Sequence, residues 1–166
     1  MIIPFRWIFA AVLAAAVHEL SHIAAIRITG GQVTGVYIGI LCAKIETVSI
    51  SRYREALCAA AGPLGSLILS LTVSSFPEAA VCAAVQGAYN LLPIYPLDGG
   101  RILYTLLPKA ACAGIEIFAE VLLLGIGIWG SLTWDIGILP LFPGMFAAAK
   151  GLERKIPCKE VKQAVQ

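Results

Sequence analysis

Charged residues are scarce in this chain, and their scarcity excludes several classes of protein. They make up 13% of its 166 residues, whereas hydrophobic residues make up 59%. A soluble domain contains about 25% charged residues, and a core of this size could not bury so much apolar surface. The net charge of +2 is small, and no basic stripe of the kind that binds nucleic acid is present. We therefore expect a protein of the lipid bilayer with no nucleic-acid partner.

Residues that commonly carry chemistry are also few. The five cysteines are an odd number without a CxxC pair, so we interpret them as buried, inert thiols. The chain has two histidines and two aspartates. An ionisable group inside a membrane span costs roughly 2.5–3.5 kcal/mol, so it usually marks function. These few residues are therefore the first candidates for a site.

Apolar runs of the length that spans a bilayer, about 17–25 residues, predict an all-α polytopic membrane protein with about five transmembrane helices. The expected spans are residues 5–26, 56–76, 79–107, 111–129 and a short 136–149. A signal peptide over residues 1–16 is less favoured, because its basic region would consist of one arginine. Prolines and glycines interrupt the third span, and backbone broken inside a membrane must face protein or water. This break should therefore line a polar cavity.

The segment between the first two spans differs from the rest of the chain. Residues 30–51 contain several glycines and alternating β-branched residues, a pattern typical of short strands and turns. We predict a small membrane-associated β-hairpin here. In the next span, Gly62 and Gly65 are expected to allow close helix packing.

Basic residues predict the orientation of the chain. They cluster in the connection after the first span, between the third and fourth spans, and in the tail: Arg27, Lys44, Arg52, Arg54, Lys109, Lys150, Arg154, Lys155, Lys159 and Lys162. Because basic loops face the cytoplasm, we expect a multi-pass cell-membrane protein with a cytoplasmic C-terminus. Residues 1–150 would form the membrane domain and 151–166 a short cytoplasmic tail.

Residues 18–22 read His-Glu-Leu-Ser-His, an H-E-x-x-H motif near the end of the first span. On a helix, His18 and His22 share one face, where both imidazoles can bind one Zn²⁺. Glu19 can then act as general base toward a water molecule. The alternative is that these polar groups are structural and form hydrogen bonds between helices.

Asp98 is the candidate third ligand, because it lies in the break of the third span. Pro93 and Pro96 prevent a continuous helix there, and Gly99 and Gly100 are expected to allow positive φ and close approach. The alternative is a plain kink in which Asp98 pairs with Arg101. Two further acidic residues, Glu116 and Glu120, are expected to lie at the membrane interface or to snorkel toward it. The alternative is that they line the entry to the cavity.

These motifs resemble those of the site-2 protease family of intramembrane metalloproteases. The two motifs that support this resemblance are His18-Glu19-x-x-His22 and Asn90-x-x-Pro93-x-x-x-x-Asp98-Gly99. The local sequences of residues 90–100 and of Ala61-Gly62-Pro63-Leu64 are most similar to the sporulation factor IV type of this family. Members of that type release a transcription factor from a membrane-tethered precursor. The resemblance covers about residues 5–107, the family's catalytic three-helix core. A span before the catalytic helix, a nucleotide-binding domain and a PDZ insertion, found in some relatives, are not expected here.

The resemblance implies one Zn²⁺ per chain, held by His18, His22 and Asp98, and the distribution of basic residues places this end of the first span on the cytoplasmic side. It also implies Glu19 as the catalytic base, Asn90 as a substrate-binding residue, and a β region that pairs with a substrate strand. The expected function is hydrolysis of peptide bonds in membrane-tethered proteins, with a membrane inhibitor or regulator as a further partner. The alternatives are a polytopic metal-ion transporter, which also uses His, Asp and Glu in broken helices, and a catalytically silent membrane adaptor.

Overall fold

The computed structural model of the chain describes residues 4–31, 33–38, 43–47 and 51–134. It contains two compact units, Met1–Glu116 and Ile117–Gln166. The candidate site lies entirely in the first unit. The expected fifth span, residues 136–149, and the tail from residue 151 lie outside the described residues.

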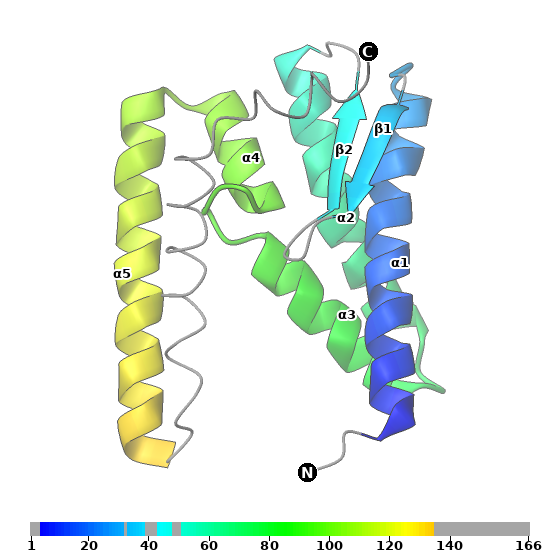
Figure 1. The fold of residues 1–166 in the computed structure, drawn as a ribbon, viewed down its shortest axis with the longest axis vertical. Coiled ribbons are helices and arrows are strands. Elements are labelled where there is room, and N and C mark those ends of the chain that lie inside the picture. The colour runs from blue at the N-terminus through cyan, green and yellow to red at the C-terminus, as the bar shows by residue number, and fades with distance from the viewer. Residues whose placement is uncertain (1–3, 32, 39–42, 48–50, 135–166) are drawn as a thin grey trace, which may run out of the picture. The chain divides into compact units, whose positions relative to one another are not determined.

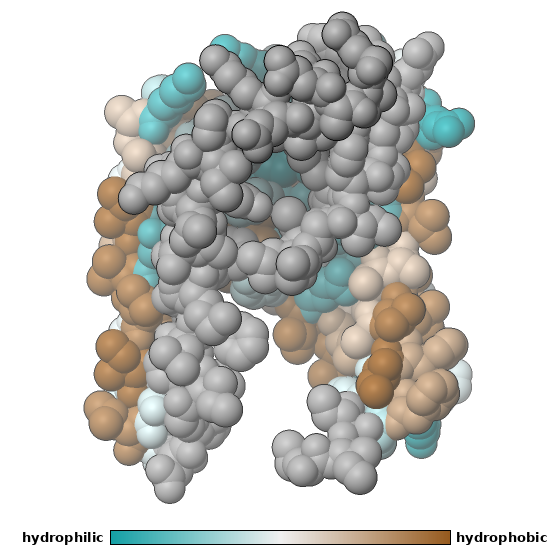
Figure 2. Space-filling model, in the orientation of Figure 1, coloured by the Kyte–Doolittle hydropathy of each residue, from teal (hydrophilic) through white to brown (hydrophobic). Residues whose placement is uncertain are grey.

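Three of the described helices are long and apolar enough to cross a membrane. They are α1 (Phe5–Ile28), α2 (Arg52–Thr72) and α5 (Lys109–Trp134). Large apolar side chains cover the outside of α1, among them Phe9, Val12 and Leu20, and Figure 2 shows this hydrophobic surface. Side chains of this kind are stable against lipid, so the described helices support membrane association, while the total of five spans remains a prediction.

The third predicted span is divided into two helices. These are α3 (Pro77–Asn90) and α4 (Asp98–Leu106), of 14 and 9 residues. Residues 91–97 between them form a loop that contains Pro93 and Pro96, which cannot donate a helical hydrogen bond. The break expected from the sequence is present, and Asp98 begins the helix that follows it.

Small residues allow the helices of the first unit to pack closely. On α1, every fourth residue from Ala10 to Ile26 is buried, and this stripe includes both histidines: Ala10, Ala14, His18, His22 and Ile26. Residues four apart share one face of a helix. That face meets α2 and α3, which lie beside α1 in Figure 1. Packing therefore places the histidines between helices and away from lipid.

Two antiparallel strands lie between α1 and α2. They are β1 (Val33–Ile38) and β2 (Ala43–Thr47), with Val36 opposite Ile45 and an irregularity between Val33 and Gly35. Residues 39–42, which connect the strands, lie outside the described residues. The placement of this segment at the membrane surface and its pairing with substrate stay predictions.

An ion pair joins the first turns of α1 and α3. Arg6 Nε lies 3.3 Å from Glu78 Oε1, and the Arg6 guanidinium lies 5.7 Å from the centre of the Phe76 ring. Exposed pairs of this kind contribute about 0–1 kcal/mol. This ion pair lies at the first turn of α3. The candidate site lies near the loop that follows the last turn of the same helix, so the two are separate.

Candidate metal centre

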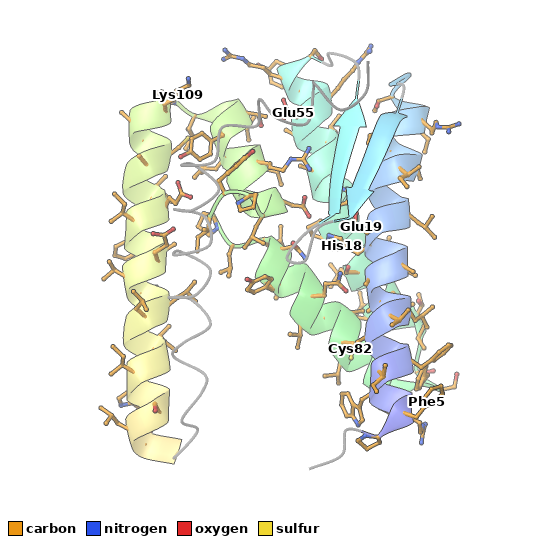
Figure 3. The ribbon with its side chains drawn as sticks, viewed as in Figure 1. Phe5, His18, Glu19, Glu55, Cys82 and Lys109 are labelled. Atoms are coloured by element: carbon orange, nitrogen blue, oxygen red, sulfur yellow. The ribbon has the colours of Figure 1, made fainter. Side chains whose placement is uncertain are left out.

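The two histidines of the H-E-x-x-H motif face the same buried space. His18 is 2% exposed and His22 is 6% exposed, and their Nε2 atoms are 3.3 Å apart. One turn of α1 separates them, as the sequence predicts. Figure 3 marks His18 and Glu19 next to each other on this helix.

Asp98 reaches the histidines from α4. The residue is 5% exposed, and its Oδ2 atom lies 3.1 Å from Nε2 of His18 and 3.1 Å from Nε2 of His22. The three ligand atoms all lie within 4.8 Å of one another, an arrangement that could hold a metal ion. The structure therefore brings together the residues that the sequence selects, from positions 80 residues apart.

The other ring nitrogens of the histidines are held by α2. Nδ1 of His22 donates to the backbone carbonyl of Cys58 at 2.7 Å, and Nδ1 of His18 lies 2.9 Å from Oγ of Ser66. A carbonyl can only accept, so Nδ1 of His22 carries its proton and the neutral ring has its lone pair on Nε2. That lone pair points toward a carboxylate oxygen, which is also an acceptor.

Two acceptors that face each other need a cation or a proton between them. A tetrahedral zinc site with bonds of about 2.0–2.1 Å has ligand atoms roughly 3.3 Å apart. The separations of 3.1, 3.1 and 3.3 Å among the three atoms are close to this value. Fixing each histidine through its second nitrogen is also the usual arrangement for a metal ligand. The donor set therefore fits zinc.

Glycines allow α2 to approach the histidines. A Cβ atom at Gly62 would overlap the imidazole of His22 and lie 2.8 Å from Nε2 of His18. One turn along α2, a Cβ at Gly65 would overlap the hydroxyl of Ser21. Both glycines permit the close packing expected from the sequence, and Gly62 also shapes the site.

Gly99 and Gly100 serve close approach alone. A Cβ at Gly99 would overlap the carbonyl of Leu91, and one at Gly100 would overlap the backbone of Ile94. Neither residue uses the positive φ that glycine allows, since both belong to the first turn of α4; in the described residues, Gly30 is the glycine with positive φ, at 77°.

Arg101 contacts the same carboxylate on its other side. Its Nη1 atom lies 3.7 Å from Oδ1 of Asp98, while Oδ2 faces the histidines. The two sequence interpretations of Asp98, an ion pair with Arg101 and a metal ligand, are therefore compatible.

Glu19 and Asn90 lie outside the cluster of three. Glu19 is half-buried and, within the described residues, makes no hydrogen bond or ion pair. Asn90 is the last residue of α3, and its side-chain amide donates to the Gln86 carbonyl at 3.1 Å. Their roles as base and substrate contact stay predictions.

Glu116 is a buried carboxylate near the start of α5. It is 5% exposed and accepts two hydrogen bonds, from the Tyr95 backbone and the Tyr104 hydroxyl, so its side chain does not snorkel toward water. Its placement at the membrane interface stays a prediction. The sequence interpretation missed Ser66 and the Cys58 carbonyl. For Glu116 the sequence does contain a usable signal, because a carboxyl group inside a long apolar helix is costly and therefore indicates a buried partner.

No protein-family model matches the sequence, and no curated protein matches it. A solved structure does match: the site-2 protease from Methanocaldococcus jannaschii, with a TM-score of 0.56 and 21% sequence identity over 80% of this chain and 70% of that chain. At this identity the similarity concerns the fold. The chain thus has a fold similar to that of a site-2 protease, with a candidate metal centre of two histidines and one aspartate.

Proposed function

We propose that the protein is an intramembrane zinc metalloprotease that hydrolyses peptide bonds of membrane-tethered proteins. The observation that carries the proposal is the convergence of His18 Nε2, His22 Nε2 and Asp98 Oδ2, with both histidines fixed through Nδ1. Three protein ligands leave the fourth zinc position open, which is the pattern of catalytic rather than structural sites. The similarity in fold supports the same reaction class.

Each residue of the site would have its own role in peptide hydrolysis. Zinc held by His18, His22 and Asp98 would supply a more acidic water molecule and polarise the scissile carbonyl. The Glu19 carboxylate accepts a proton as the water oxygen adds to the carbonyl carbon. It then returns this proton to the peptide nitrogen as the C–N bond breaks, which yields a carboxylic acid and an amine. The proton taken up is the proton delivered, so the base is regenerated.

Substrate would have to be extended before it can react, because a helix hides its peptide groups. The strands β1 and β2 offer an edge to which an extended segment can pair by β-augmentation. Asn90 at the end of α3 would contact the substrate backbone. The finer proposal is a membrane-tethered transcription-factor precursor as substrate, supported by the similarity of residues 90–100 to the sporulation factor IV type.

Co-expression with membrane-tethered candidate substrates tests this function. We expect cleavage by the natural chain and none by Glu19→Gln. Glu55→Gln, a carboxylate change in the first turn of α2, serves as the control and should cleave normally. Cleavage that persists in Glu19→Gln would contradict the assignment of the base. Zinc transport by reconstituted vesicles without proteolysis would instead indicate the metal-transporter alternative.

A further inference from the structure

The first half of α5 contains a buried carboxylate that the proposed chemistry does not use. Glu116 is 5% exposed, although α5 is apolar enough to cross a membrane. An ionisable group in such a helix costs roughly 2.5–3.5 kcal/mol, so compensating interactions are expected. The Tyr95 N–H donates to Oε1 at 2.9 Å, and the Tyr104 hydroxyl donates to Oε2 at 2.8 Å. Both donors lie in the first unit, as Glu116 does.

The Tyr95 hydrogen bond provides an acceptor for the last backbone N–H group of the loop at residues 91–97. Two of its seven residues are prolines without an N–H, and four others donate to backbone carbonyls: Leu91, Leu92, Ile94 and Leu97. The remaining amide, that of Tyr95, donates to Glu116. Backbone that is irregular at membrane depth must find its partners in the protein. Glu116 is therefore the side chain that accepts the one loop N–H group without a backbone acceptor in the described part of the chain.

The two residues that donate to Glu116, Tyr95 and Tyr104, lie on either side of Asp98 in the sequence. Tyr95 precedes it by three residues in the loop, and Tyr104 follows it by six residues on α4. The two tyrosine rings meet edge to face, with centres 6.0 Å apart. The first turn of α4 also lies directly on the loop, because Gly99 and Gly100 leave no room for a side chain there. A shift of the loop would therefore move Asp98.

From this arrangement we infer that Glu116 is a positioning residue for the metal centre. It holds the loop on one side of Asp98 and α4 on the other, so that Oδ2 stays within reach of both imidazoles. It acts through these segments and does not belong to the ligand cluster. The inference rests on the proposed zinc site.

The test compares two substitutions of similar volume in the full chain, purified in detergent micelles. Glu116→Gln keeps a carbonyl oxygen for the Tyr95 N–H, whereas Glu116→Leu removes every acceptor. Zinc affinity is measured by competition with a chelator, and hydrogen exchange of residues 91–98 is measured without metal. We expect Glu116→Leu to weaken zinc binding by about 10- to 100-fold, the range for residues that orient ligands, and to speed exchange. Glu116→Gln should weaken zinc binding by no more than about threefold, a loss well below that range.

The control is Glu78→Gln, which removes a paired carboxylate at the opposite end of α3, about 18 Å along the helix from Asn90. It should leave zinc affinity unchanged. Natural zinc affinity and natural exchange in Glu116→Leu would overturn the inference while leaving the zinc site intact. If Glu116→Leu does not fold, Tyr104→Phe deletes only the hydroxyl bonded to Oε2, and unchanged affinity and exchange in that variant would overturn it equally. Failure of the natural chain to bind zinc would overturn both the proposed function and this inference.

Discussion

Ser66 and His18 are joined across the interface of α2 and α1, with Ser66 Oγ 2.9 Å from His18 Nδ1. Ser66 is fully buried, and the opposite nitrogen of the ring faces Asp98. The hydroxyl therefore fixes both the tilt of the imidazole and the nitrogen that is left for the metal.

Ser66→Ala should weaken zinc binding because His18 loses this partner. We expect a loss of about 10- to 100-fold in zinc affinity, the usual cost of removing a group that orients a ligand. Chelator competition on the purified protein measures it. Ser70→Ala, one turn further along α2, is the matched control and should bind zinc normally. Equal affinities for the two variants would show that Ser66 does not orient His18.

Gly62→Ala should disrupt the centre by steric overlap. Its new Cβ would occupy the space of the His22 ring, and forced repacking of a tight interior costs about 1–3 kcal/mol. We expect a folded helical protein that binds zinc poorly. Gly114→Ala adds the same methyl group on α5, where nothing lies within 4 Å of the added atom, and it should bind zinc like the natural chain. Circular dichroism and metal analysis distinguish a damaged site from an unfolded protein.

The sequence predicts those parts of the site that have local signatures. His18 and His22 are one helical turn apart, so their shared face follows from helix geometry alone. Asp98 is recognisable because a carboxylate beside two prolines interrupts an apolar run.

The remaining parts depend on how separate helices align, which a single sequence does not encode locally. Ser66 and the Cys58 carbonyl reach the histidines only through the register of α2 against α1. Glu116 reaches Tyr95 only because the start of α5, which belongs to the first unit, lies beside the loop. Gly99 and Gly100 serve close approach without positive φ for a related reason, since the helix begins one residue before them, at Asp98.

Basic residues predict a cytoplasmic C-terminus. Five of the twelve lysines and arginines follow residue 149, and basic segments remain on the cytoplasmic side during insertion. A reporter that is active only in the cytoplasm, fused after Gln166, should therefore be active. The same reporter fused before Met1 should be inactive, because five spans place the two ends on opposite sides. The reverse pattern would contradict the predicted orientation, and equal activity of the two fusions would exclude an odd number of spans such as five.

The final prediction separates the metal ligand from the base. Asp98 and Glu19 are both carboxylates in a costly environment, so their charge alone does not distinguish them. Their geometry does. Asp98 Oδ2 lies 3.1 Å from both histidine Nε2 atoms, whereas Glu19 is absent from the group of ligand atoms.

Asp98→Ala should therefore lose both activity and zinc, since two histidines fall short of the usual three protein ligands. Its loss of zinc affinity should exceed the about 10- to 100-fold expected for an orienting residue. Glu19→Gln keeps the size of the side chain but removes its basicity. It should retain one zinc per chain while turnover falls by about 10²- to 10⁴-fold, the contribution of a general base. Metal analysis after mild chelation, combined with a cleavage assay, measures both quantities. Full zinc occupancy in Asp98→Ala would exclude Asp98 as a ligand, and loss of zinc in Glu19→Gln would place Glu19 among the ligands instead.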